Sequence, residues 1–312
     1  MKLTVFDIGG TDIKYSVMDE SLECIRQGKT PTPTENQDAL LARLKELYDE
    51  IGKDTEGIAV SMPGMIDSDN GYCRTGGMLA YNQDKYVARQ ISELCGCPVH
   101  IDNDGKCAAW AEYTVGSLAG CQNAAAFIIG TGVGGGLIID GKLVRGKHFS
   151  AGEFSFVGRS LNEWGTLKGF VGHSDATTGL LELMREAKGI PMETPLDGRQ
   201  AFEWINAGDL VACEVLDKFT YSIAFEIFNL QMLLDIERIA IGGGISGQDI
   251  LLESIQKNYR KLILDDAFFG MKGLVEPNCE IVKCRYGNEA NQIGAFQSYL
   301  TWKKEKQYEQ IS

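Results

Sequence analysis

An apolar stretch near the start of the chain, Leu3 to Phe6, ends in an acid, two glycines and a hydroxyl: Asp7-Ile8-Gly9-Gly10-Thr11. A second apolar stretch, Ile13 to Met18, follows directly. Because glycine permits the backbone conformations that tight turns require, this order predicts two strands joined by a glycine turn. The same order returns between Ala125 and Val144, around the turn Gly130 to Gly135. The chain therefore contains a duplicated unit, which restricts the folds available to it.

Short runs rich in valine and isoleucine alternate with stretches whose apolar residues recur every 3.6 positions, a pattern typical of α/β proteins. The predicted strands are Leu3 to Phe6, Ile13 to Met18, Gly57 to Met62, Val99 to Ile101, Ala125 to Ile129, Gly136 to Ile139, Arg238 to Ile241 and Glu280 to Cys284. The predicted helices are Asn36 to Ile51, Lys106 to Gly116, Ala176 to Ala187, Asp209 to Leu234, Asp249 to Leu264 and Glu289 to about Lys304.

The glycine turns suggest phosphate binding. A turn without side chains lets backbone N–H groups approach a phosphate closely. In the first turn Gly9 and Gly10 would expose amides, Thr11 would offer a hydroxyl, and Asp7 could hold magnesium directly or through water. A tight hairpin with a capping aspartate is the alternative for this turn taken alone.

The second turn matches the G-x-G-x-x-G spacing, but it is followed by "GLIIDGKLV", a strand and then a turn, and not by a helix. A dinucleotide-binding fingerprint must open a helix, so a Rossmann site is excluded, and no Walker A loop is present. A third cluster, Gly242-Gly243-Gly244, lies between a predicted strand and a predicted helix. Such a turn can let a nucleotide contact the backbone directly, or it can be needed only for the backbone conformation of the turn.

The composition excludes several classes of partner. A net charge of −13 argues against binding to nucleic acid or anionic lipid, which both require clustered Lys and Arg. The longest charge-free apolar stretch, Ala124 to Ile139, is too short and too rich in glycine to span a membrane. Asp7 interrupts the start before a signal peptide can form, so we expect a cytoplasmic protein. The nine cysteines show no metal-binding spacing and are expected to be free thiols.

A series of motifs makes the interpretation specific. They are "DIGGTDIK", "SMPGMID", "HIDNDGKCAAWAE", "GTGVGGGLIIDGKLVRG", "AGEF", "IAIGGGIS" and "GNEANQIGA", between about Leu3 and Tyr299. In this order they resemble the ROK-family sugar kinases of the actin/hexokinase-like ATPase superfamily. The resemblance implies two actin-like (ribonuclease H-like) α/β domains with a cleft between them. Residues 1–118 and 294–312 would form the sugar-side domain, and residues 119–293 the nucleotide-side domain.

The family's residue roles fall on matching positions of this sequence. The resemblance implies ATP and magnesium, with Asp7 near the metal, Gly9, Gly10, Thr11, Thr131 and Gly132 on the phosphates, and Gly243 and Gly244 beside the adenosine. Gly64, Asn82, Asn103, Asp104 and Glu153 would line the sugar site, and a homodimer is implied. Asp104 would be the general base, since an aspartate can accept a sugar hydroxyl proton as the bond to phosphorus forms. The alternative is that Asp102-Asn103-Asp104 only ends a strand and caps a helix.

The sequence departs from the family at Phe156, which stands where many members have a histidine that binds zinc. No cysteine occurs between Cys121 and Cys213, so we expect no structural zinc. An aromatic ring can instead pack on a sugar or an aglycone, as in the zinc-lacking branch that includes β-glucoside kinases. The predicted substrate is therefore glucose or the terminal glucose of a β-glucoside such as cellobiose. N-acetylmannosamine, fructose and allose stay open, as does a non-catalytic sugar sensor or a regulator.

Overall fold

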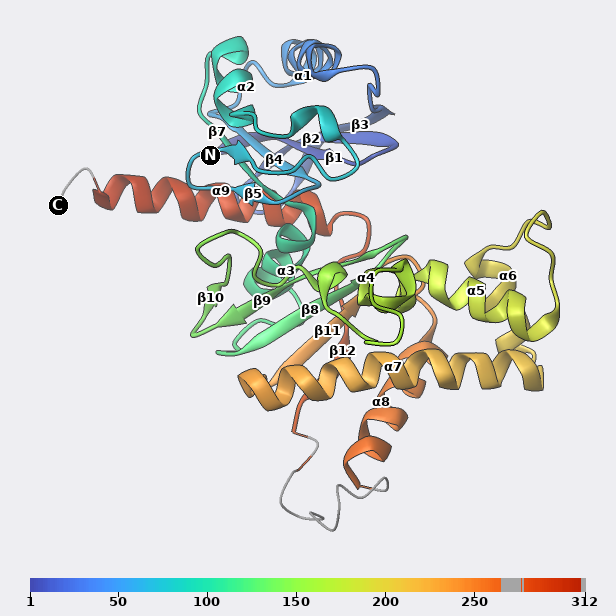
Figure 1. The fold of residues 1–312 in the computed structure, drawn as a ribbon. Coiled ribbons are helices and arrows are strands. Elements are labelled where there is room, and N and C mark those ends of the chain that lie inside the picture. The colour runs from blue at the N-terminus through green and yellow to red at the C-terminus, as the bar shows by residue number, and fades with distance from the viewer. Residues whose placement is uncertain (265–275, 277, 310–312) are drawn as a thin grey trace. The chain divides into compact units, whose positions relative to one another are not determined.

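The computed structural model describes residues 1–264, 276 and 278–309 (Figure 1). The chain forms two compact units. The first unit contains residues 1–114, 145–151 and 288–312, and the second contains residues 115–144 and 152–287. From the sequence, we expected the chain to pass from one domain to the other near residues 118/119 and 293/294. The sequence did not indicate that the short segment 145–151 groups with the first unit.

The first unit is built on a five-stranded sheet in the order β3-β2-β1-β4-β7. Its strands are β1 (Lys2–Ile8), β2 (Asp12–Asp19), β3 (Cys24–Pro31), β4 (Ile58–Met62) and β7 (Val99–Asn103). The hairpin strands β1, β2 and β3 pair antiparallel, whereas β1, β4 and β7 run parallel. A two-residue pair, β5 (Ile66–Asp67) and β6 (Tyr72–Cys73), and the turn η1 (Ala80–Asn82) complete its strands and turns.

Helices cover both faces of this sheet. Figure 1 shows α1 (Gln37–Ile51) and α2 (Val87–Cys95) on one face and α9 (Ala290–Glu309) on the other. Leu40, Leu44 and Leu47 of α1 are fully buried against Phe6, Ile8 and Val60 of the sheet. The opposite face packs against α9, where Gly294 lies so close to α3 (Asp104–Val115) that a Cβ would stand 1.8 Å from the carbonyl oxygen of Cys107.

The second unit repeats the same sheet, in the order β10-β9-β8-β11-β12. Its strands are β8 (Ala124–Ile129), β9 (Val133–Ile139), β10 (Lys142–Leu143), β11 (Arg238–Gly242) and β12 (Glu280–Lys283). Its helices and turns are η2 (Phe154–Phe156), η3 (Leu167–Gly169), α4 (Val171–Ser174), α5 (Thr177–Lys188), α6 (Gly198–Asn206), α7 (Leu210–Leu234) and α8 (Asp249–Leu264). One continuous apolar core joins the sheet to α5, α6, α7 and α8.

The two sheets share one topology: in each, an antiparallel hairpin is followed by two parallel strands. This confirms the predicted duplication and the α/β class. The strands and helices predicted from the sequence did not include β3, α2 and α6. The strand β3 is an edge strand with mostly polar residues around Gly28, and α2 and α6 have only nine residues each.

Further observations bear on the predicted absences. No helix among the described residues is long and apolar enough to cross a membrane. In the part of the chain that the structure describes, no three His, Cys, Asp or Glu side chains gather in a way that would hold a metal ion. All nine cysteines are free.

Two acidic side chains of the second unit are buried: Asp175, which lies between α4 and α5, and Glu226 of α7. Ser222 Oγ donates to Asp175 Oδ1 at 2.6 Å, and Arg159 Nε lies 3.8 Å from the same oxygen. Burial raises the pKa of Asp175 to about 6 despite these contacts. Burial and the nearby Asp175 raise the pKa of Glu226 to about 7. Both groups therefore bind their protons more tightly in the folded protein than in the unfolded chain.

We expect the second unit to be more stable at pH 5 than at pH 8. A carboxyl group whose pKa is raised by folding stabilises the folded state below its unfolded pKa. That stability is lost as the pH rises through the folded value, here between about 4 and 7. The loss is on the order of a few kcal/mol, and the unfolding temperature measured across this range reports it. Glu226→Gln should flatten the profile near pH 7. If the unfolding temperature of that variant depended on pH as in the wild type, the loss of stability would come from the protein's overall net charge and not from Glu226.

Candidate functional site

The parallel strands of the first sheet end at one edge, where polar residues meet in register. Asp7 of β1 pairs with Ser61 of β4, which in turn pairs with Asp102 of β7. The carboxyl ends of parallel strands form a common edge, which in α/β proteins is where ligands bind. The sequence motifs around Asp7, Gly64 and Asp104 therefore converge at this edge, although up to 97 positions separate them in the sequence.

Asp7 is almost fully buried and its carboxylate is held from several sides. Ser61 Oγ and Asn291 Nδ2 each donate to Oδ1 at 3.0 Å, and Lys14 Nζ lies 3.4 Å from Oδ2. Asn291 comes from α9 and lies in the quoted motif "GNEANQIGA", but nothing in the sequence indicates its contact with Asp7. A single oriented carboxylate suits magnesium, which keeps several waters and takes its other ligands from phosphates.

The first glycine turn lies between β1 and β2. The Gly9 N–H donates to the Asp12 carbonyl at 2.9 Å, and Thr32 Oγ1 donates to the Gly9 carbonyl at 2.7 Å. Thr11 is exposed. A Cβ on Gly10 would stand 2.9 Å from Cε of the exposed Met78 side chain. The flexible Met78 side chain thus lies against Gly10, and it would have to move for a phosphate to approach the turn there.

Asp104 is the first residue of α3 and is half-buried. Its Oδ1 accepts from the backbone N–H of Gly105 at 2.8 Å and from Asn103 Nδ2 at 3.1 Å. Asn103 also caps the helix, because its Oδ1 accepts from the Lys106 N–H at 3.0 Å. The capping interpretation therefore applies to Asn103. It leaves Asp104 as an oriented carboxylate at the helix N-terminus.

Gly64 contacts Asn103 at this edge, whereas Asn82 lies in η1 and contacts α1. The Gly64 carbonyl accepts from Asn103 Nδ2 at 2.9 Å. Gly64 has a φ of +110°, and a Cβ there would stand 2.1 Å from the Thr75 carbonyl oxygen. Only glycine fits this position without strain. Asn82 is fully buried, and its Oδ1 accepts from Gln37 Nε2 at 3.3 Å. Its Nδ2 has no hydrogen-bond partner among the described residues.

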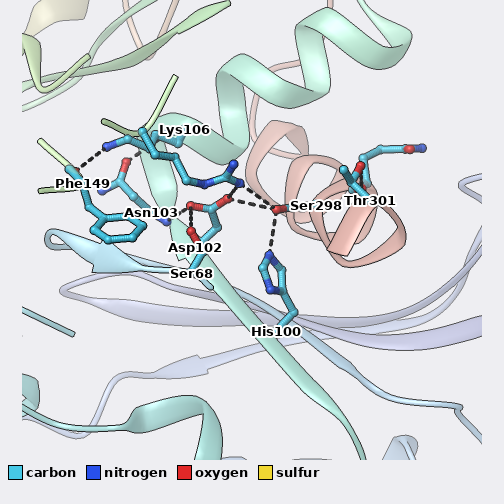
Figure 2. Close-up of polar contacts among 10 residues, drawn as sticks. Ser68, His100, Asp102, Asn103, Lys106, Phe149, Ser298 and Thr301 are labelled. Carbon is cyan, nitrogen blue, oxygen red and sulfur yellow. Dashed lines mark hydrogen bonds and ion pairs between the residues drawn. The ribbon is translucent and has the colours of Figure 1, made fainter. Parts of the chain in front are cut away.

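A buried polar network, which the sequence did not reveal, surrounds Asp102 near the end of β7, two residues before the predicted base in the chain (Figure 2). Asp102 is fully buried, and Arg145 Nη2 donates to its Oδ2. Ser298 Oγ of α9 donates to the same oxygen at 2.9 Å, and His100 Nε2 lies 2.9 Å from Ser298 Oγ. Because a carboxylate only accepts, Ser298 donates to Asp102 and His100 Nε2 must donate to Ser298.

The charges of this network are well defined. Burial alone would raise the pKa of Asp102, but Arg145, His100 and the hydrogen bonds from Arg145 and Ser298 lower it below its usual value. Burial lowers the pKa of His100 to about 4, so the imidazole is neutral at pH 7. Burial would lower the pKa of Arg145, but Asp102 outweighs that effect and raises it. The network is therefore one buried ion pair supported by neutral donors.

The second unit carries its own glycine turn after β8. Thr131 and Gly132 are exposed, and the Gly130 N–H donates to the Gly132 carbonyl at 2.9 Å. The first turn of α5 approaches this loop, since the Thr177 N–H donates to the Gly130 carbonyl at 3.0 Å. Thr178 Oγ1 donates to the Thr131 carbonyl, also at 3.0 Å. A glycine turn beside a helix N-terminus is a favourable environment for a phosphate.

The third glycine cluster follows β11. Gly243 has a φ of +95°, and a Cβ there would stand 2.1 Å from the Ile129 carbonyl oxygen. A Cβ on Gly244 would meet nothing within 4 Å. The two neighbours therefore differ in kind: Gly243 is required by the backbone, whereas Gly244 leaves an open surface. Both belong to the edge at which β8 and β11 end.

Glu153 and Phe156 belong to the short segment around η2. Phe154 is buried and packs against Phe127 with ring centroids 5.4 Å apart, which fixes the segment on the sheet. Phe156 points away from this core and is 67% exposed. The chain has two histidines besides His100. His148 lies in the segment 145–151, and His173 Nε2 lies 3.1 Å from Glu182 Oε1.

The comparisons with known proteins agree over almost the whole chain. A β-glucoside kinase of Listeria monocytogenes is 30% identical over 303 residues, which cover 96% of this chain and 98% of that kinase. An N-acetyl-D-glucosamine kinase of Vibrio atlanticus is 30% identical over 303 residues, with 93% and 97% coverage. The crystal structure of a ROK family protein from Streptococcus pneumoniae in complex with sucrose aligns with a TM-score of 0.84 at 28% identity, covering 99% and 100% of the two chains. The sequence model of the ROK family matches residues 4–301, and the chain therefore belongs to the ROK family.

Proposed function

We propose that this protein transfers the γ-phosphoryl group of ATP to the 6-hydroxyl of glucose or of the terminal glucose of a β-glucoside such as cellobiose. As to class, it is an ATP-dependent sugar kinase, in line with its full-length relatives. The observation that carries the finer proposal is the oriented carboxylate of Asp104 at the ligand-binding edge of the first sheet.

Asp104 would act as the general base. A sugar hydroxyl is a poor nucleophile, and a carboxylate within hydrogen-bond reach can accept its proton as the bond to phosphorus forms. Asn103 Nδ2 and the Gly105 N–H both hold Oδ1, so the carboxylate does not need to be ordered at the moment of reaction. Asn103 and Glu153 would bind sugar hydroxyls. The buried Nδ2 of Asn82, which has no partner in the described part of the chain, is a further candidate donor.

The remaining acceleration would come from neutralising the phosphates. The Gly9 N–H is already bonded to the Asp12 carbonyl, so in the first turn the amides of Gly10 and Thr11 would bind phosphate oxygens. Thr131 and Gly132 would do so in the second turn, with Gly243 and Gly244 beside the adenosine. Asp7, alone or through water, would hold magnesium, which when bound neutralises charge on the transferred group. Ser61 and Asn291 keep the Asp7 carboxylate oriented for that role.

Two observations favour a β-glucoside over a free sugar. Kinases of Listeria monocytogenes and Klebsiella pneumoniae that are similar to this chain are β-glucoside kinases. The exposed ring of Phe156 offers a face on which an aglycone could pack. N-acetyl-D-glucosamine is the second candidate, because the kinase of Vibrio atlanticus has the same identity to this chain.

The proposal is tested by measuring ADP release from magnesium-ATP with glucose, cellobiose, an aryl β-glucoside, N-acetylglucosamine, N-acetylmannosamine, fructose and allose. We expect the highest kcat/KM on the β-glucosides. The highest value on N-acetylglucosamine would replace the proposed substrate. Turnover of no sugar would favour the sensor or regulator. The predicted homodimer and cytoplasmic location rest on resemblance and composition, and the mass in solution tests the former.

Phe156→Ala should lower kcat/KM for an aryl β-glucoside by about 3- to 10-fold, the range expected for one aromatic contact. The value for glucose should change less than twofold because glucose has no aglycone. Leu161→Ala is the matched control, since Leu161 is 89% exposed in the same segment. Equal losses on both sugars would contradict an aglycone contact at Phe156.

A further inference from the structure

The segment 145–151 leaves the second unit after β10 and returns to it just before Glu153, yet it belongs to the first unit. Two contacts fasten it there. Arg145 donates to the buried Asp102, and the buried Lys106 Nζ donates to the Phe149 carbonyl at 3.4 Å. The Arg74 guanidinium also lies over the Phe149 ring, 5.5 Å from its centroid. The segment is thus fixed on β7, which ends at Asn103, and on α3, which begins at Asp104; Figure 2 shows the contact between Lys106 and Phe149.

Arg145 is the positive charge that pairs with Asp102. A carboxylate with no exposed surface is costly unless it is paired, and Ser298, Ser68 and the Asn103 N–H supply only neutral donors. The guanidinium and the Ser298 hydroxyl share Oδ2, which directs Oδ1 toward the backbone of Asn103. Arg145 therefore supplies the charged contact among the four donors that orient the Asp102 side chain.

This orientation reaches Asp104 in two steps. Asp102 Oδ1 accepts the Asn103 N–H at 2.9 Å and so holds the backbone at the end of β7. The Asn103 side chain then donates to Asp104 Oδ1 and to the Gly64 carbonyl while it caps α3. None of these contacts involves the glycine turns that would bind ATP.

We propose that Arg145 is a positioning residue for phosphoryl transfer, acting on the carboxylate of Asp104 through Asp102 and Asn103. The inference rests on the proposed function of Asp104 as the base. A displacement of about 1 Å at a catalytic group can cost about 100-fold in rate, so a residue that never touches the substrate can still control turnover.

The test compares Arg145→Met, the double variant Arg145→Met with Asp102→Asn, and Arg238→Met. Arg238 is the matched control. Its side chain is 30% exposed, close to the 27% of Arg145, and it also pairs with a carboxylate, that of Glu280. It donates to the Ser117 carbonyl as well and lies far from this network in the sequence. For each variant kcat, the KM for ATP and the unfolding temperature are measured with the best sugar of the wild-type panel. Amide hydrogen exchange at Gly105 and Lys106 is measured as well.

We expect Arg145→Met to lose about 100-fold in kcat with the KM for ATP changed less than threefold. It should also be destabilised, because it leaves the Asp102 charge unpaired. The double variant removes both charges and should regain most of the unfolding temperature. Its kcat should stay at least 10-fold low, with faster exchange at Gly105 and Lys106 than in Arg238→Met.

A double variant that regains wild-type kcat together with stability would reduce Arg145 to a structural role and overturn the inference. A folded Arg145→Met within threefold of the wild-type kcat would do the same. If the wild type phosphorylates no sugar, the proposed function fails, and the exchange data alone decide whether Arg145 holds residues 103–106 in place. Unchanged exchange in the double variant would then overturn the inference.

Discussion

Asp104→Asn should lower kcat for sugar phosphorylation by about 100-fold or more, while the KM for the sugar changes less than threefold. The asparagine oxygen can still accept from the Gly105 N–H and from Asn103 Nδ2, so the side chain keeps its position. What is lost is the basicity that accepts the hydroxyl proton. The expected pattern, a fall in kcat with little change in KM, is that of a group needed in the transition state and not for binding.

Asp38→Asn is the control for this substitution. Asp38 lies in the first turn of α1, in the same unit, and is exposed. It shares with Asp104 its place at a helix N-terminus, so any general loss of favourable charge at that position appears in both variants. Asp38→Asn should keep wild-type kcat. If Asp104→Asn also kept it, Asp104 would be removed from the mechanism.

The second large effect is expected at Gly243. Gly243→Ala should destabilise the second unit by about 2–5 kcal/mol, because alanine is unfavourable at a φ of +95° and its Cβ would stand 2.1 Å from the Ile129 carbonyl oxygen. Since the clash is with backbone, no side-chain rotation relieves it. Urea or thermal unfolding measures the loss.

Gly244→Ala is the adjacent control. Its Cβ meets nothing within 4 Å, so the variant should unfold within about 1 kcal/mol of the wild type. If Gly244 lies beside the adenosine, the added methyl group should raise the KM for ATP without lowering stability. Equal destabilisation by the two substitutions would contradict a backbone clash specific to Gly243. An unchanged KM for ATP in Gly244→Ala would show that the adenosine does not bind beside Gly244.

The sequence is most informative where local pattern and chemistry coincide. The runs Leu3 to Phe6 and Ala125 to Ile129 are apolar and are followed by glycines, so strands and turns can be placed there from the residues alone. The strand β3 cannot be placed from its residues alone, because its side chains are mostly polar and alternate between partial burial and exposure. Its place is set by pairing with β2, a tertiary contact that the sequence does not display.

The site shows the same limit. Asp7 and Asp104 stand in recognisable motifs, and the structure places them where parallel strands end at one edge. Arg145 stands 43 positions from Asp102, and Ser298 stands 196 positions from it. Neither residue follows a periodic pattern that would indicate a buried partner. An isolated arginine after a short strand predicts only an exposed side chain.

The three-piece composition of the first unit has a consequence for synthesis. The ribosome makes β1, β2, β3, β4 and β7 first, but the helix that covers β1, β4 and β7 is made last. Asn291 and Ser298, which hold Asp7 and Asp102, also come from that helix. A nascent chain therefore begins the first unit and can complete it only after the second unit has been translated. Residues 1–114 expressed alone would lack α9 and would expose the apolar sheet face that it covers. A single truncation of the chain therefore does not separate the two units.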